Sequence, residues 1–232
     1  ILNADVKWNK EKKQIDIHAI ADDGPQAKTY IDGFVAPGPG PGYIDLGIRA
    51  DGTYLDFAHS FTSSFIGHID GHGKGHARVI GPLDAINLTG ELVLNGQAYV
   101  KTLGCTYEMR NDTVRMVPNE IAFVHCPIYD IHGNQGILTG GIHHVELTNL
   151  TYDIYVSADN LLAYDFPDFG DELFYGTVFV QGTAAIHGRD DEVLIEADVT
   201  PQEHSFLVYN AATPDAITNT EFIRWGSKAD LA

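Results

Sequence analysis

Alternation of apolar and polar residues with a period of two is the feature that most restricts what this chain can fold into. The segment LTYDIYVSAD, residues 150–159, shows it over ten positions. Its apolar positions are Leu150, Tyr152, Ile154, Val156 and Ala158, its polar positions are Thr151, Asp153, Ser157 and Asp159, and Tyr155 is the exception. Successive side chains of a strand point to opposite faces of a sheet, so this pattern predicts a strand with one buried and one solvated face.

Several other segments repeat this period. They are KQIDIHA (13–19), YIDLGIRA (43–50), INLTGELVL (86–94) and EVLIEADVT (192–200). No long amphipathic helix is visible between them. We therefore expect an all-β chain with little helix, forming a single elongated β domain over residues 1–232.

Proline and glycine mark where the strands stop. The segment APGPGPG, residues 36–42, predicts a turn or loop, because a strand interior rejects this density of proline. The stretch from Asp159 to Phe174 has room for a helical turn, limited by Pro167 and Gly170.

Three histidines stand four residues apart in GHIDGHGKGH, at His68, His72 and His76. That spacing suits a zinc site on a helix, but four interspersed glycines make a helix costly, at about 1 kcal/mol each. In a strand the same residues share a face and lie roughly 13 Å apart, too far for one ion. We interpret the histidines as polar residues facing water, and the glycines as places where strands bend or turn.

A weak internal repeat supports successive addition of strands. GHARVIGPLDAINLTGEL begins at Gly75 and GTAAIHGRDDEVLIEADV begins at Gly182, with a glycine at the same offset in each, Gly81 and Gly188. Each copy predicts a strand, a short polar turn and another strand.

Charge and cysteine content exclude some classes of function. Asp and Glu outnumber Lys and Arg by 32 to 14, which gives a formal net charge of -18. Such a surface repels nucleic acid and anionic bilayer surfaces. Cys105 and Cys126 are the two cysteines, so the chain is no disulfide scaffold, and one disulfide or two buried thiols both fit the sequence.

Three segments in order resemble one protein family. They are GKGHARVIGPLDAINLTGEL (73–92), YDIHGNQGILTGGIHH (129–144) and YGTVFVQGTAAIHG (175–188), the last followed by VLIEADVT. Over about residues 67–199 the chain resembles TamB-type proteins, the AsmA-like component of the translocation and assembly module, in the form found in Bacteroidetes.

The resemblance implies a curled or groove-forming sheet with an apolar interior, in an excerpt of a longer chain anchored in the inner membrane of a Gram-negative bacterium. It implies periplasmic transport of phospholipid between the two membranes, or assembly of outer-membrane proteins beside a BamA-type barrel. It carries over no catalytic residue, cofactor or metal ligand. The start at Ile1, without methionine, agrees with an excerpt.

One-sided strands would supply the apolar lining for lipid tails. The candidate lining residues are Ile44, Leu46, Ile48, Ile154, Val156, Val178, Val180, Val193, Ile195 and Val199. The alternative is that these side chains pack on one another as a closed core. Sequence leaves both arrangements open.

A second class of function is a secreted β-solenoid that binds or cleaves polysaccharide, because acidic pairs are abundant. Most of these pairs flank turns, where Asp favours the backbone geometry, and Trp8 and Trp225 stand near opposite ends of the chain. The acidic cluster between Asp165 and Glu172 is a weaker candidate for calcium, since its spacing fits no EF-hand.

Overall fold

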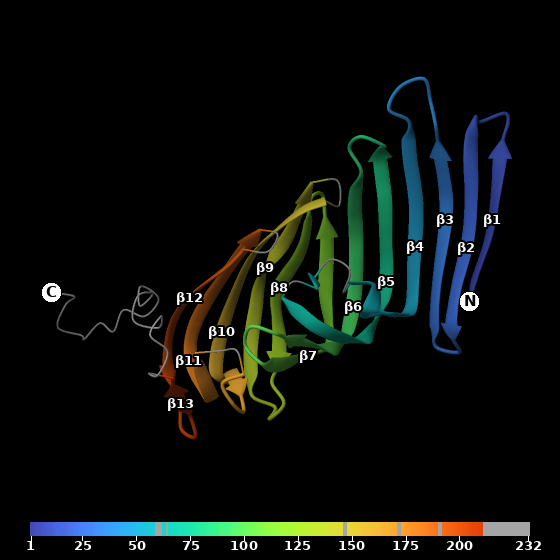
Figure 1. Cartoon of the computed structure of the whole chain (residues 1–232). Coiled ribbons are helices and arrows are strands. Elements are labelled where there is room, and N and C mark those ends of the chain that lie inside the picture. The colour runs from blue at the N-terminus through green and yellow to red at the C-terminus, as the bar shows by residue number, and fades with distance from the viewer. Residues whose placement is uncertain (59–61, 64, 146–147, 171–172, 190–191, 211–232) are drawn as a thin grey trace.

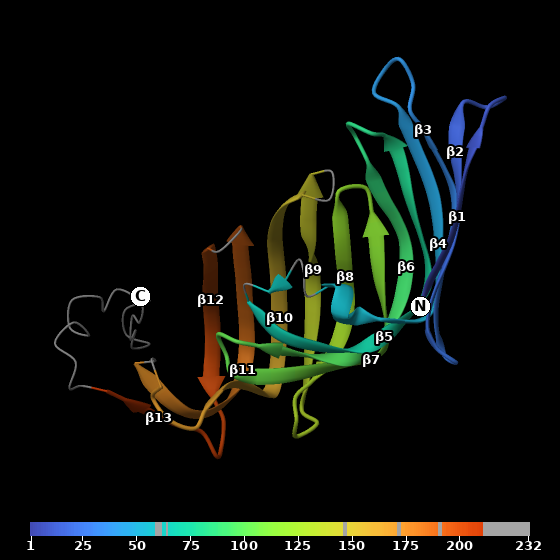
Figure 2. The same cartoon turned by 45° about the vertical axis from the view of Figure 1, so that its right-hand side comes forward.

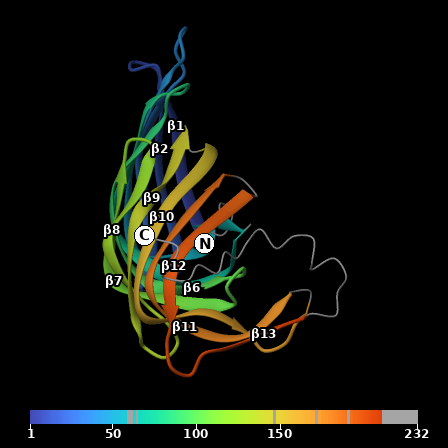
Figure 3. The ribbon, with the colours of Figure 1, turned by 90° about the vertical axis from the view of Figure 1, so that its left-hand side faces the viewer.

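The computed structural model describes residues 1–210 except 59–61, 64, 146–147, 171–172 and 190–191. These residues form one antiparallel sheet of 13 strands, in which nearly every strand lies between its neighbours in the sequence (Figure 1). The sheet is not closed or strongly curled, and Figure 3, which looks along the row of strands, shows the strands bending to one side toward their lower ends. The expectation of an elongated all-β fold with little helix, built strand after strand, is confirmed, but the strong curl that the resemblance implied is not found.

The strands are long and their connections are short. Their bounds are β1 (Leu2–Asn9), β2 (Gln14–Gly24), β3 (Ala27–Ala36), β4 (Tyr43–Tyr54), β5 (Ile66–Pro82), β6 (Asn87–Val100), β7 (Cys105–Val117), β8 (Glu120–Tyr129), β9 (Gln135–Val145), β10 (Thr148–Phe166), β11 (Phe174–Arg189), β12 (Glu192–Pro201) and β13 (Phe206–Tyr209). A short 3-10 helix, η1 (Leu55–Ala58), follows β4. No helix among the described residues is long and apolar enough to cross a bilayer.

The outer edge of β11 pairs with two strands. β12 pairs with Val180–Arg189, and β13 pairs with Phe174–Thr177. The chain therefore leaves the edge after Pro201 and returns to it at Phe206, which leaves β13 at the lower end of the sheet (Figure 1).

Register separates the sheet into two chemically different faces. Directly paired residues of antiparallel strands share a face, so the pairs Ile48–Ala77, Ile154–Ile186 and Ile186–Ile195 lie on one side. We call this side the apolar face and the opposite side the polar face. The period-two pattern of the sequence accounts for both.

The histidine stretch lies within β5, and its alternation is regular. His68, His72 and His76 are exposed on the polar face. The residues between them, such as Gly73 and Ala77, are buried on the apolar face. The predicted strand and the orientation of the histidines toward water are confirmed.

The glycines of this stretch lie inside the strand, so the expectation that they mark bends or turns is wrong for Gly75. At Gly75 (φ +149°), on the apolar face, an added Cβ would collide with the carbonyl oxygen of Glu91 on β6. At Gly182 (φ +144°) on β11, an added Cβ would likewise collide with the carbonyl oxygen of Asp198 on β12. Glycine at these positions lets neighbouring backbones approach closely on one side of the sheet.

Past the end of the β9–β10 pairing, the β6–β7 turn and β7 contact β10 directly. The Asp165 amide donates to the Leu103 carbonyl at 2.9 Å, and the Tyr107 hydroxyl donates to the Leu162 carbonyl at 2.8 Å. The lower parts of β5 and β7 accordingly sweep across β8–β10 (Figure 2). The ring of Phe65, just before β5, lies 5.0 Å from the ring of Tyr152 on β10.

This crossing creates a buried core in the middle of the sheet. Ile128, Ala158, Leu161 and Val180 form its centre. Tyr107 and Met109 of β7 pack against it, and so do Leu138, Val156, Ala163 and Val178 of β9–β11. Here the apolar face is covered by the protein itself.

Two local expectations had different outcomes. The loop at residues 36–42 is confirmed, since it connects β3 and β4. The helical turn after Asp159 is wrong as far as Phe166, because β10 continues to that residue. Asp171 and Glu172, farther along that stretch, lie outside the described residues.

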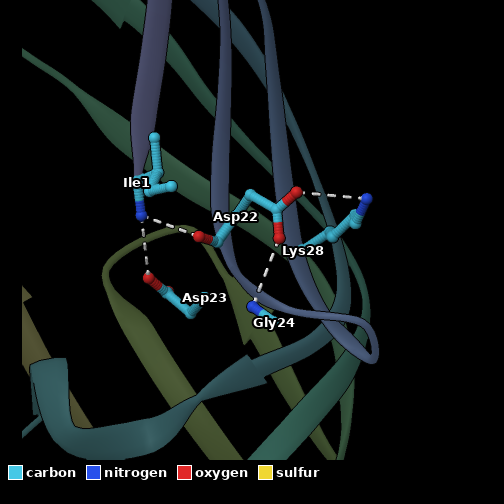
Figure 4. Close-up of polar contacts among 5 residues, drawn as sticks. All are labelled: Ile1, Asp22, Asp23, Gly24 and Lys28. Carbon is cyan, nitrogen blue, oxygen red and sulfur yellow. Dashed lines mark hydrogen bonds and ion pairs between the residues drawn. The ribbon is translucent and has the colours of Figure 1, made fainter.

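The β2–β3 turn shows how carboxylates fix the hairpins (Figure 4). Asp22 accepts a hydrogen bond from the Gly24 amide at 3.2 Å and pairs with Lys28 at 3.2 Å. The Ile1 nitrogen donates to the Asp22 carbonyl at 2.7 Å, next to Asp23. Hydrogen bonding by Lys28, then by Gly24, lowers the pKa of Asp22.

Candidate functional site

The register places all ten predicted lining residues on the apolar face. They are Ile44, Leu46 and Ile48 on β4, Ile154 and Val156 on β10, Val178 and Val180 on β11, and Val193, Ile195 and Val199 on β12. The intervening strands continue the same surface with residues such as Leu92 on β6 and Val114 on β7. One side of the sheet is therefore largely hydrocarbon from β1 to β13.

These ten residues differ in accessibility. Val180 is 6% exposed and belongs to the buried core, against which Val156 and Val178 pack. The β4 residues and Ile154 are half-buried. On β12, Val193, Ile195 and Val199 are 37%, 42% and 36% exposed. The closed-core alternative thus describes the middle of the sheet, and an accessible apolar surface remains on β12.

A second accessible region lies at the other edge and was absent from the predicted lining. Leu2, Val6 and Trp8 of β1 are on the apolar face and are 69%, 59% and 53% exposed. The period-two pattern of LNADVKWN was a sufficient signal for this region.

Polar side chains on the apolar face are few, and most of them are uncharged. The hydroxyls of Thr29 and Thr53 hydrogen-bond to each other at 2.6 Å. His144 is 3% exposed, and its pKa is lowered by burial and then by the nearby His143, which favours the neutral ring. Asp112 accepts a hydrogen bond from the Thr113 amide at 2.7 Å.

Cys105 and Cys126 are free, buried thiols on this face, which settles the choice between a disulfide and two thiols. Burial raises the pKa of Cys105 to about 12 and also raises the pKa of Cys126. Both thiols therefore stay protonated near neutral pH and behave as apolar packing residues.

The polar face carries the charge of the sheet. Arg78 donates two hydrogen bonds to Asp45, at 2.7 and 2.6 Å, and this holds the pKa of Asp45 below its usual range. A shallow hollow of about 730 Å³ lies over β9–β12, lined mainly by polar-face residues that include Tyr155, Glu196 and Asp198. Val156, Ala184 and Ala197 of the apolar face also contribute to its lining.

No group of three or more His, Cys, Asp or Glu residues in the described part of the chain is arranged to hold a metal ion. Within the proposed calcium cluster, Asp165 accepts a hydrogen bond from the Thr177 hydroxyl at 2.8 Å, and Asp168 accepts one from the Gly170 amide at 3.1 Å.

The segment YDIHGNQG forms a tightly bonded turn between β8 and β9. Asp130 is 3% exposed, and its Oδ1 accepts from the His132 and Asn134 amides, each at 2.9 Å. Its Oδ2 accepts from Asn134 Nδ2 at 2.9 Å and from the Leu162 amide at 2.8 Å. One carboxylate thus closes the turn and ties it to β10, at the place where the sheet bends.

Residues 129–228 match the family model of the TamB C-terminal domain. The match begins one residue before Asp130 and continues past β13 into residues that the structure does not describe. It covers less than half of the 232 residues, and the resembling segment at 73–92 lies outside it. No curated protein and no solved structure matches the chain.

The TamB match supports part of what the motifs implied. TamB-family proteins are non-enzymatic, and in Gram-negative bacteria they are periplasmic and anchored in the inner membrane. The matched part of this chain contributes β9–β13 to the sheet. A Bacteroidetes origin and the status of an excerpt stay predictions.

Proposed function

We propose that this chain is a non-enzymatic segment of a TamB-type protein, and that its apolar face holds phospholipid acyl chains in transit between the inner and outer membranes. The observation that carries the proposal is that every strand from β1 to β12 contributes apolar residues to the same face, with accessible regions on β1 and β12. Assembly of outer-membrane proteins beside a BamA-type barrel is a linked role implied by the family. The segment would act in the periplasm, with its anchor outside this chain.

The chemistry of the face suits a sliding ligand. Each methylene shielded from water contributes about 0.8 kcal/mol, so the face stabilises an acyl chain in proportion to the methylenes that it covers. Branched aliphatic side chains such as Val193 and Ile195 offer no hydrogen bond that would fix a lipid in one register. A carboxylate on this surface would oppose the passage of a hydrocarbon chain.

The buried core divides the accessible surface. Tyr107 and Met109 already cover the apolar face near Leu161, and Phe65 covers it at Tyr152. In this structure the two edge regions are therefore the parts of the apolar face most accessible to acyl chains.

The test is a pair of substitutions on adjacent residues of β12. Ile195→Asp places a carboxylate on the apolar face, and Leu194→Asp places one on the polar face, where Leu194 is 56% exposed. Both sites are exposed, so each change should cost only about 1 kcal/mol of stability. Phospholipid that copurifies without detergent, quantified by mass spectrometry, should fall with Ile195→Asp and persist with Leu194→Asp.

Equal lipid content in both variants, with unchanged melting, would refute the assignment to this face. Collapse of the fold with Ile195→Asp would show that β12 covers a closed core.

A further inference from the structure

The lower end of the β11–β13 region breaks the two-faced pattern of the sheet. All four residues of β13, Phe206–Tyr209, are exposed and apolar or aromatic, at 53%, 51%, 37% and 42%. Leu173, before β11, is 43% exposed. We call Leu173–Tyr175 together with Phe206–Tyr209 the aromatic tip.

The register shows that the aromatic tip is apolar on both faces. Leu207 pairs with Gly176 and Tyr209 with Phe174 on the apolar face, and Phe206 and Val208 lie on the polar face. On other strands of the sheet the polar face carries charged or hydrogen-bonding groups, for example along β5. A partner with one flat binding surface would cover only half of this tip.

The aromatic tip is held in place by its own contacts. The rings of Phe174 and Tyr209 lie 5.2 Å apart on one face, and those of Tyr175 and Phe206 lie 6.4 Å apart on the other. The Tyr164 hydroxyl donates to the Phe174 carbonyl at 2.8 Å. These contacts hold the aromatic tip at the lower end of the sheet, where β13 lies (Figure 3).

The charge of the residues around the aromatic tip indicates what kind of surface can bind it. The described residues 161–170, 173–180 and 201–210 contain no Lys or Arg, and they contain Asp165, Asp168 and Glu203. An anionic surface would be repelled, whereas a surface without net charge would not. Phe, Tyr and Leu side chains are the groups that enter the interfacial region of a bilayer, because it accepts rings and hydroxyls together.

We propose that the aromatic tip inserts into the interfacial region of a zwitterionic phospholipid bilayer, with both faces of β13 in contact with lipid. A bilayer surrounds an inserted segment, so it covers both faces at once. This docking goes beyond the proposed function, because it does not depend on whether the apolar face of the sheet carries acyl chains.

The experiment is cosedimentation of the chain with sucrose-loaded phosphatidylcholine vesicles. Leu207→Asn and Phe206→Asn change one residue on each face of β13, and Leu194→Asn is the control for an exposed leucine on β12. Each tip variant should lower the vesicle partition coefficient about tenfold or more, and the control should leave it unchanged. Circular dichroism and melting should match the parent chain, because both tip residues are exposed.

The two faces give the decisive comparison. A loss with Leu207→Asn alone would overturn the proposal, because it would indicate adsorption through the apolar face. Unchanged vesicle binding in both variants would overturn it as well. So would the finding that the variants reduce self-association of the chain and leave vesicle binding unchanged. Replacing half of the phosphatidylcholine with phosphatidylglycerol should weaken binding at low salt, and stronger binding would contradict the charge argument.

Vesicle binding is separable from the proposed function through Ile195→Asp. We expect this variant to keep its vesicle partition coefficient and to lose copurified phospholipid. A fluorophore on His204→Cys, in the exposed turn just before β13, should show brominated-lipid quenching, and one on Leu194→Cys should not. The native thiols are buried and should not compete for the label in the folded chain.

Discussion

Replacing Asp130 tests whether one carboxylate holds the bend of the sheet. Asp130→Ala removes the acceptor for four hydrogen bonds, three within the β8–β9 turn and one from the Leu162 amide of β10. His132 is exposed and Asn134 half-buried, so water can replace the turn interactions at small cost. Leu162 is fully buried, so its amide would lose its partner in a place that water does not reach.

The expected cost follows from these environments. A buried, unsatisfied amide costs about 1–3 kcal/mol, and a charge-assisted hydrogen bond contributes about 1.5–3 kcal/mol before rehydration. We therefore expect Asp130→Ala to lower the free energy of unfolding by about 3 kcal/mol. Asp130→Asn keeps one oxygen acceptor, but its NH₂ group then faces an N–H donor and cannot accept a hydrogen bond from it. This variant should therefore lower the free energy of unfolding by about 2 kcal/mol.

The effect should depend on pH in a definite direction. Burial alone would raise the pKa of Asp130, but hydrogen bonds from Asn134, Leu162 and His132 outweigh it and hold the pKa below its usual range. A carboxyl group with a lowered folded-state pKa stabilises the fold above its unfolded pKa of about 3.9, and this stability is lost as pH falls through the folded value. The difference between the parent chain and Asp130→Asn should therefore shrink from pH 6 toward pH 3.

Urea unfolding followed by circular dichroism at several pH values measures both quantities. A difference below about 1 kcal/mol at pH 6 would show that the turn does not hold the bend. A difference that stays constant from pH 6 to pH 3 would show that the ionised form of Asp130 is not what stabilises the fold.

Three other changes probe the same architecture. Leu161→Asp buries a charge beside Val180 and should cost several kcal/mol in urea unfolding, whereas tolerance of it would mean that the core is open to water. Gly75→Ala should cost about 2–3 kcal/mol because its Cβ meets the Glu91 carbonyl, and Gly40→Ala, with no atom within 4 Å, should change stability by less than about 0.5 kcal/mol. Cys105, with its pKa raised to about 12, should react with a disulfide reagent at pH 8 only as fast as the chain unfolds, and rapid labelling of the folded chain would contradict its burial.

Local pattern was sufficient to predict much of the sheet. The alternation at residues 150–159 and 192–200 identified β10 and β12 and put their apolar residues on the correct relative faces, because a strand has only two faces. Register with the neighbouring strands then follows from short hairpins. The candidate lining residues consequently share a face although they come from four separate strands.

Features that depend on contacts between residues far apart in the sequence could not be predicted from local pattern. The core forms because the β8–β9 hairpin ends early and lets Leu103 and Tyr107 reach β10, which no local pattern encodes. For the same reason Val180 looked equivalent to Ile195 in the sequence but is buried. Gly75 resembled a turn residue because its close approach to Glu91 involves a neighbouring strand.

Strand order that follows the chain also determines how this protein can gain and lose structure. Apart from the β7–β10 contact, most strands pair with the strands next to them in the sequence. Each new hairpin can therefore form on the free edge of the preceding strand. Edge strands such as β1 can then fray without disturbing the middle, and amide hydrogens there should exchange fastest. A chain of this kind can fold progressively as it emerges from a translocation pore, and it can be lengthened or shortened by whole hairpins while the remaining register is preserved.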